Sequence, residues 1–193
     1  MRVITGKYRG RKLNTPVGND IRPTTDKAKE AMFSILTNYI YGSRVLDLFA
    51  GTGGLGIEAL SRGAEYCMFC DASRSSLKLV KENLEHCKVE EDYAFAAGDY
   101  KKTLKSLGTK IEEGLAEQFD IVLMDPPYSK GLLDDAFKLL QEGNILADDG
   151  IIVAEHRKEE DLPEELYGFV KEKERRYGIV KLSIFRKQAD EEE

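Results

Sequence analysis

The run Asp125-Pro126-Pro127-Tyr128 carries the residue types needed to hold a planar amine. It directly follows the apolar residues 121–124, which are typical of a buried strand. Each proline fixes φ and lacks an amide donor, so the Asp125 carboxylate and the Pro126 carbonyl are acceptors on a rigid turn. They could accept both N–H groups of an exocyclic base amine while Tyr128 stacks on the base. These four residues are therefore the candidate catalytic residues, although a plain turn would also use two prolines.

A glycine-rich run, Asp47 to Gly56, lies earlier in the chain, where a strand is expected to give way to a helix. Glycines allow the backbone to approach a ligand closely, and a helix N-terminus directs its amides toward that ligand. The spacing of Gly51, Gly53 and Gly56 matches the G-x-G-x-x-G pattern of dinucleotide sites. Asp71 would end the next strand, where an acid bonds ribose hydroxyls. The spacing predicts an adenosine-type ligand but does not separate NAD from another adenosyl cofactor.

Two further acids favour a sulfonium cofactor over a dinucleotide. Asp47 would repel a pyrophosphate, whereas it suits the ammonium group of a ligand. Asp99 would end the third strand and could accept a hydrogen bond from an adenine amine; it could equally cap the following helix, and the two roles are compatible. The expected cofactor contacts are Asp47, Phe49, Ala50, Gly51, Thr52, Gly53, Asp71, Ala72, Ser73, Gly98, Asp99 and Tyr100.

Short apolar runs alternate with amphipathic stretches, which predicts an α/β fold with helices on both faces of a parallel sheet. Parallel strands are expected at 44–49, 65–71, 93–97, 119–124 and 150–155, and an antiparallel hairpin at 167–174 and 179–187. Helices are expected at 26–41, 53–62, 73–87 and 132–142, and at 99–117 with breaks near Gly108 and Gly114. Residues 1–14 could form a small hairpin.

Composition and charge narrow the class of protein. A chain of 193 residues that is 41% hydrophobic is ordinary for one globular domain, and its longest apolar runs are far shorter than the ~20 residues of a membrane span. No secretory signal is readable, so a cytoplasmic location is expected. The net charge is −6, yet residues 1–30 hold eight basic and three acidic residues. Such a basic arm on an acidic body could bind nucleic-acid phosphates.

The cysteine and histidine positions do not indicate a metal or redox site. Cys67 and Cys70 form a C-x-x-C pattern, but they lie inside an expected strand on opposite faces, and no second pair exists. His86 and His156 share no metal-ligand spacing with other candidates. We therefore expect the cysteines to pack in the core and the protein to bind no metal.

Several segments together match one family pattern almost end to end. They are Ile4-Thr5-Gly6, Arg9-Gly10-Arg11-Lys12-Leu13, Arg22-Pro23-Thr24-Thr25-Asp26, Leu46 to Gly53, Leu55 to Ala64 and Asp125 to Tyr128. On these motifs the chain resembles class I S-adenosylmethionine-dependent methyltransferases of the RsmD type, which methylate guanine N2 in bacterial small-subunit rRNA. Lys29 departs from that pattern, which places an Arg before Glu30.

The resemblance implies a Rossmann-like, mostly parallel seven-stranded sheet with an antiparallel C-terminal hairpin at its edge. It also implies S-adenosylmethionine as the methyl donor and 16S rRNA or the small ribosomal subunit as the partner, with guanine 966 as the target. The expected organisation is a basic arm at 1–25, a methyltransferase domain at 26–187 and an acidic tail at 188–193. A monomer is expected by default.

The implied reaction is direct methyl transfer to N2 of a guanine that has been extruded into the pocket. Asp125 and the Pro126 carbonyl would stabilise the charge that develops on the nitrogen, and positioning would supply most of the rest. Arg9, Arg11, Lys12 and Arg22 would hold rRNA phosphates. Three alternatives stay open: an amino-methyltransferase acting on adenine or cytosine of RNA or DNA, an NAD-dependent oxidoreductase, and an rRNA-binding assembly factor without catalysis.

Overall fold

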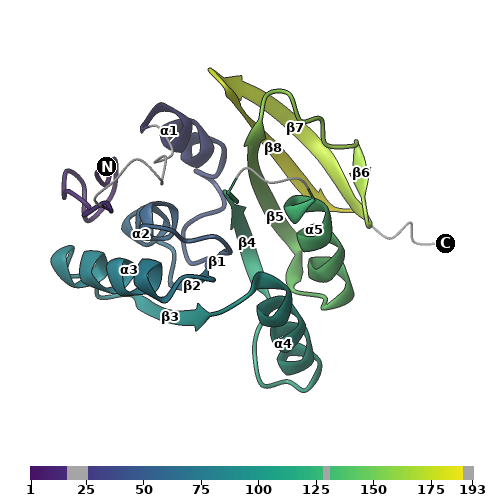
Figure 1. Cartoon of the computed structure of the whole chain (residues 1–193), viewed down its shortest axis with the longest axis horizontal. Coiled ribbons are helices and arrows are strands. Elements are labelled where there is room, and N and C mark those ends of the chain that lie inside the picture. The colour runs from purple at the N-terminus through teal and green to yellow at the C-terminus, as the bar shows by residue number, and fades with distance from the viewer. Residues whose placement is uncertain (17–25, 128–130, 189–193) are drawn as a thin grey trace.

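An eight-stranded sheet runs through the middle of the molecule (Figure 1). The computed structural model describes residues 1–16, 26–127 and 131–188. The strand order is β3-β2-β1-β4-β5-β8-β7-β6, with β3 to β5 running parallel and β8 to β6 antiparallel. The strands are β1 (Arg44–Asp47), β2 (Tyr66–Asp71), β3 (Asp92–Ala97), β4 (Phe119–Met124), β5 (Leu146–Arg157), β6 (Glu165–Leu166), β7 (Phe169–Tyr177) and β8 (Val180–Lys187).

Helices cover both faces of this sheet and create two apolar layers (Figure 1). The helices are α1 (Asp26–Ile35), α2 (Gly54–Ser61), α3 (Arg74–His86), α4 (Tyr100–Glu112) and α5 (Leu132–Glu142). Side chains alternate along a strand, so Ile121 and Leu123 pack toward α1, α2 and α3, whereas Met124 packs toward α4 and α5. Cys67 and Cys70 fall into opposite layers in the same way, which confirms their expected packing role. No helix of the described ranges has both the length and the hydropathy to cross a membrane.

The predicted α/β class and the mixed sheet are confirmed, with differences at individual elements. The sheet has eight strands rather than seven, because the two-residue β6 is too short to carry an alternating pattern. The expected 26–41 helix ends at Ile35, since the chain then turns and the amides of Tyr39 and Ile40 both bond the Leu36 carbonyl. Strand β5 begins at Leu146, four residues earlier than expected.

The expected break at Gly108 is wrong, because α4 passes through this residue without interruption. A Cβ atom at Gly108 would lie 2.6 Å from the Cα of Gly143, which follows α5. The glycine therefore allows α4 and the end of α5 to approach closely. The helix ends at Glu112, before Gly114 takes up a positive φ of 70°.

The first residues of the chain fold back onto α2 and α3 (Figure 1). Arg2 and Lys12 form an antiparallel bridge, so the expected hairpin at 1–14 is present in its smallest form. Val3, Tyr8 and Leu13 are buried in the layer that contains α1, α2 and α3. The arm therefore shares its apolar packing with the body of the protein.

A buried carboxylate on α2 fastens the arm. Glu58 accepts hydrogen bonds from the amides of Ile4 at 2.8 Å and Thr5 at 3.0 Å. It also pairs with Lys29 at 3.3 Å and Arg62 at 2.8 Å. Four donors around one buried carboxylate compensate for the cost of removing its charge from water. Lys29 is thus a fully buried structural cation, which takes it away from any nucleic-acid contact.

Candidate functional site

The glycine-rich turn joins β1 to α2 in a backbone conformation that side chains rarely permit. Gly51 and Gly53 have positive φ angles of 54° and 79°. Gly56 faces Phe69 of β2, whose ring would lie 2.3 Å from a Cβ atom at this position. The turn therefore brings backbone amides to the carboxyl end of the sheet and packs α2 tightly against β2.

Asp47 ends β1 and lies beneath this turn. Its Oδ2 accepts a hydrogen bond from the Gly56 amide at 2.9 Å, while its Oδ1 is buried without a hydrogen-bond partner among the described residues. The pKa of Asp47 is raised to about 7, mainly by burial, while the Gly56 amide opposes the rise and the charges of Asp125 and Asp71 add to it. A buried acceptor beside two other acids fits a cationic donor such as an ammonium group.

Asp71, the last residue of β2, and Asp99, which follows β3, are held by backbone amides. Asp71 accepts from Gly51 at 2.9 Å and from Ser73 at 2.8 Å, so it links two neighbouring turns. Asp99 caps α4, because its Oδ1 accepts from the amides of the first helical residues at 2.9 and 3.3 Å. The capping role weighed for Asp99 is confirmed. Asp99 lies just beyond the carboxyl end of β3, and its second role, contact with an adenine amine, stays a prediction.

The other residues expected at the cofactor site lie on the same turns. The rings of Phe49 and Tyr100 contact each other with centroids 5.4 Å apart, although they follow β1 and β3. Ala72 is exposed beside Asp71, and the Gly98 amide bonds the Asp71 carbonyl at 3.0 Å. Ala50 is buried in the turn itself. The sheet thus gathers sequence-distant turns at one edge.

Thr52 was expected to contact the cofactor, but its side chain points away from the other residues predicted at that site. It is 5% exposed, and its hydroxyl is 3.5 Å from the sulfur of Met1. The side chain of Thr52 therefore points to the arm, and Thr52 can serve a ligand only through its backbone.

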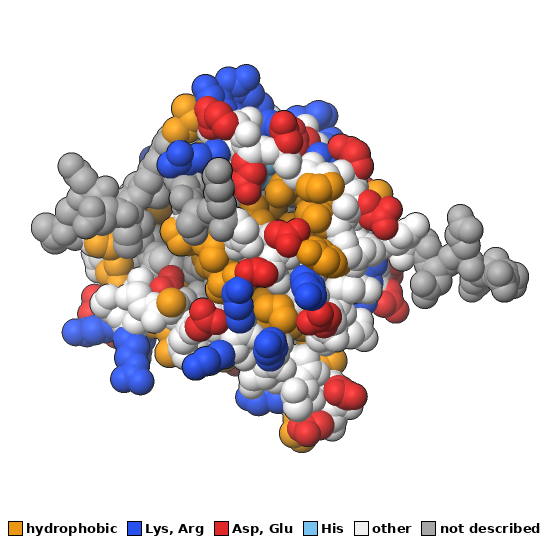
Figure 2. All heavy atoms as spheres, turned by 45° about the vertical axis from the view of Figure 1, so that its right-hand side comes forward, with side chains coloured by type: hydrophobic (Ala, Val, Ile, Leu, Met, Phe, Trp, Pro, Cys, Tyr) orange, Lys and Arg blue, Asp and Glu red, His pale blue; other side chains and the backbone are white. Residues whose placement is uncertain are grey.

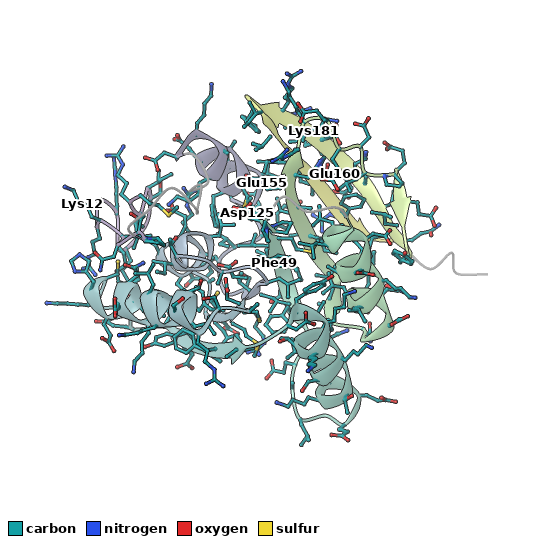
Figure 3. All side chains as sticks on the ribbon, in the orientation of Figure 1. Lys12, Phe49, Asp125, Glu155, Glu160 and Lys181 are labelled. Atoms are coloured by element: carbon teal, nitrogen blue, oxygen red, sulfur yellow. The ribbon has the colours of Figure 1, made fainter. Side chains whose placement is uncertain are left out.

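The Asp125 turn lies beside Asp47 because β4 is the parallel neighbour of β1. Asp47 pairs with Leu123 in this register, so Asp125 comes two residues beyond that pair. Asp125 is half-buried, Pro126 is buried and Pro127 is exposed. Figure 3 shows Asp125 between Phe49 and the end of β5. Tyr128 lies outside the described residues, so its expected stacking role stays a prediction.

One acid at this edge was not found by sequence reasoning. Glu155 on β5 is the residue after Ala154, which pairs with Met124, so Glu155 stands next to Asp125. It is only 3% exposed. The available signal was an acid directly after the apolar run 151–154, the same pattern that introduces Asp125.

The basic residues of the arm differ in how accessible they are to nucleic-acid phosphates. Arg9 and Lys12 are exposed, whereas Arg11 is partly buried with its guanidinium 4.9 Å from the centre of the Tyr8 ring. Lys7 pairs with two acids of the loop before β3, at 2.8 and 3.0 Å. Arg22 lies outside the described residues. Part of the arm's positive charge is therefore used to hold the arm in place.

A second group of cations lies at the turn between β7 and β8. Figure 2 shows Lys and Arg side chains gathered at the top of the molecule, where Figure 1 places this turn. Arg175 and Arg176 are exposed there, and they donate hydrogen bonds to the carbonyls of Glu174 and Gly178, respectively. Their charges remain accessible to solvent.

The described ranges contain no group of three His, Cys, Asp or Glu side chains arranged to hold a metal ion. His156 is buried inside the sheet, where its Nε2 lies 2.8 Å from the Ser183 hydroxyl. Burial lowers the pKa of His156 below its usual value. The residue therefore serves as a neutral packing partner against β8, on the face of the sheet opposite to that of Glu155.

Comparisons with known proteins agree on one family. The model of the family described as Conserved hypothetical protein 95 matches residues 1–186. The chain is 40% identical to the Bacillus subtilis protein YlbH, covering 97% of the chain and 100% of that relative. It is 35% identical to Ribosomal RNA small subunit methyltransferase D of Haemophilus influenzae, covering 96% and 93%. The solved structure of the Escherichia coli yhhF protein is similar with a TM-score of 0.82 and 32% identity, covering 98% of this chain and 99% of that one.

Proposed function

Since the chain belongs to the RsmD-type family of methyltransferases, we propose that it methylates the exocyclic N2 amine of guanine 966 in 16S rRNA. Relatives named Ribosomal RNA small subunit methyltransferase D support the rRNA substrate, with 35% identity in Haemophilus influenzae and 32% in Escherichia coli. The observation that carries the proposal is the Asp125-Pro126 turn placed beside the buried acceptor of Asp47.

S-adenosylmethionine is the methyl donor in this proposal, and when bound it supplies a methyl group made electrophilic by a sulfonium. Asp47 would accept the ammonium group through its Oδ1, the atom left without a partner among the described residues. Asp71 would bond the ribose hydroxyls and Asp99 the adenine amine. The backbone of Gly51 and Gly53 would line the same turn.

Asp125 and the Pro126 carbonyl would hold the two N–H groups of the target amine. As the amine nitrogen gains a methyl group it becomes positively charged, and the Asp125 carboxylate stabilises that charge. Asp125 then accepts one proton from the nitrogen, which leaves a neutral methylated amine. Pro127 would keep the turn rigid, and Tyr128 would stack on the extruded base.

The arm would hold rRNA phosphates through Arg9, Arg11, Lys12 and Arg22. Exposure of Arg9 and Lys12 supports these two most directly. Phosphate contacts of this kind position a substrate without reading its sequence. The proposed enzyme works as a cytoplasmic monomer, and the transfer needs no metal because the carboxylate and positioning suffice.

The test is methyl transfer from labelled S-adenosylmethionine into small ribosomal subunits and free 16S rRNA from cells lacking the enzyme. The protein, Asp125→Ala and the control Asp149→Ala, which alters an exposed acid at the opposite end of β5, are compared by nucleoside analysis. Label in N2-methylguanosine, lowered ~10²- to 10³-fold by Asp125→Ala alone, supports the proposal. No transfer by the unaltered protein to either substrate would contradict it.

The second candidate is an amino-methyltransferase acting on adenine or cytosine. It is favoured by one observation, that the Asp125-Pro126 acceptors suit any planar exocyclic amine. Label recovered in N6-methyladenosine or N4-methylcytidine would select this candidate and reject guanine.

A further inference from the structure

Glu155 and Asp125 end neighbouring strands side by side. Strands β4 and β5 are parallel, and their last registered pair is Met124 with Ala154, so Asp125 and Glu155 are the next residues on each strand. Figure 3 shows Asp125 and Glu155 close together at this end of the sheet. Because neighbouring strands are ~4.8 Å apart, the two carboxyl groups share one small region.

Both acids belong to the same face of the sheet. The residues directly before them, Met124 and Ala154, pack in the layer under α4 and α5. Leu123 and Val153, one position earlier, pack in the layer under α1, α2 and α3. Since side chains alternate, continuing the two strands by one residue directs both acids toward the α1, α2 and α3 face. Glu155 therefore flanks the amine-binding turn on the side away from Asp47.

Glu155 is an acidic residue in a buried position. It is 3% exposed, and its cross-strand neighbour on β8 is the fully buried Leu182. A carboxylate that is removed from water needs groups that compensate for its lost hydration, and a hydrogen-bond donor of a ligand can be one of them. A buried acid at the carboxyl end of a parallel sheet is a pattern expected at a functional site.

We infer that Glu155 selects guanine by accepting the hydrogen bond of its N1–H group. This inference rests on the proposed function, because Asp125 and the Pro126 carbonyl must hold the adjacent N2 amine. Guanine presents N1–H beside that amine, whereas adenine and cytosine present a ring-nitrogen acceptor beside theirs. A carboxylate accepts the first and repels the second. Glu155 thus reads the base, while Asp125 serves the reacting amine.

The test uses 16S rRNA that carries either guanine or 2-aminopurine at the target nucleotide, assembled into small subunits when free rRNA is inactive. 2-Aminopurine keeps the amine but has an unprotonated N1 that accepts hydrogen bonds. The full-length protein and Glu155→Gln are compared on both substrates through kcat/KM. Gln is isosteric and neutral, and its amide can donate to the N1 of 2-aminopurine.

We expect the unaltered protein to prefer guanine by at least ~10²-fold. Glu155→Gln should lower kcat/KM on guanine and raise it on 2-aminopurine, so that the preference falls to about tenfold or less. Loss of the guanine O6 affects both proteins alike, so the change in preference isolates the contact at N1. A preference unchanged in Glu155→Gln would overturn the inference, because a purely structural role lowers both rates together.

Two controls keep the outcome clear. Glu165→Gln alters an exposed acid on β6 and should keep the preference of the unaltered protein. If Glu155→Gln fails to fold, the unaltered protein alone decides, since equal rates on guanine and 2-aminopurine would reject a required N1–H contact. Failure of the proposed function is a different result: the unaltered protein then transfers no methyl group to guanine N2.

Discussion

The carboxyl end of the sheet has two halves that are built in different ways. In the half formed by β1, β2 and β3, Asp47, Asp71 and Asp99 each accept a hydrogen bond from a backbone amide of an adjoining turn or helix. In the half formed by β4 and β5, proline replaces the amide donors after Asp125, and Glu155 comes from a different strand. The first half is fixed by local turns, whereas the second is assembled by sheet topology. We therefore expect the first to control cofactor affinity and the second to control transfer.

The largest expected effects come from two isosteric changes, one of which should alter cofactor binding and the other the rate of methyl transfer. Asp47→Asn keeps an acceptor for the Gly56 amide but loses the charge, so cofactor Kd should rise ~10- to 100-fold. Asp125→Asn should leave that Kd unchanged and lower the single-turnover rate ~10²- to 10³-fold. Calorimetric binding and rapid-quench transfer measure the two quantities, with Asp149→Asn as the control. Equal effects of both changes on Kd would erase the distinction between the halves.

The next effect is the pH dependence of cofactor binding. The pKa of Asp47 is raised to about 7, and only its ionised form attracts an ammonium group. Cofactor affinity should therefore fall as pH decreases from 7 to 5.5, approaching tenfold per pH unit. Asp47→Asn should lose this dependence, and Asp125→Asn should keep most of it. Titration calorimetry across this range checks the result, and a flat profile for the unaltered protein would contradict it.

The same pKa shift predicts how stability depends on pH. The usual pKa of this carboxyl group is 3.8, and burial raises it to about 7 in the folded protein. The folded state therefore binds the Asp47 proton more tightly than the unfolded state, so this contribution is fully present below pH 4 and is lost as pH rises through 7. Thermal unfolding without cofactor should show Asp47→Asn gaining stability relative to the unaltered protein between pH 5 and pH 8. A constant difference would reject this assignment of the titrating group.

The two halves also differ in how far the sequence predicts them. The glycine-rich turn and Asp125 were predictable because their signals are contiguous in the chain. Glu155 was missed because its position beside Asp125 follows from the Met124 with Ala154 register, and no local pattern states that register. Lys29 counts in the sequence only as one of the eight basic residues of 1–30, whereas in the fold it pairs with the distant Glu58 in the core. Local spacing thus reveals turns and caps, while contacts across the sheet require the fold.

A smaller effect should follow from loosening the amine turn. Pro126→Ala removes the ring that restricts Asp125 and adds an amide donor near its carboxylate. Because ~0.4–1 kcal/mol of conformational restriction is lost, we expect the transfer rate to fall roughly two- to fivefold with cofactor Kd unchanged. Pro163→Ala, in an exposed loop, is the matched control. A larger change in Kd than in rate would show that this turn supports the cofactor half instead.

The smallest effect should come from the edge of the cofactor half, at Asp99. Asp99→Ser keeps a side-chain oxygen able to cap α4, so the free energy of unfolding should change by less than ~0.5 kcal/mol. The carboxylate proposed to accept the adenine amine is shortened and neutral in the variant, so cofactor Kd should rise severalfold, the loss of about one hydrogen bond. Asp99→Ala provides the comparison, because it loses the cap as well and should unfold ~1 kcal/mol more easily. If Asp99→Ser binds the cofactor as the unaltered protein does, Asp99 only caps α4. In that case Asp47 and Asp71, but not Asp99, contact the cofactor.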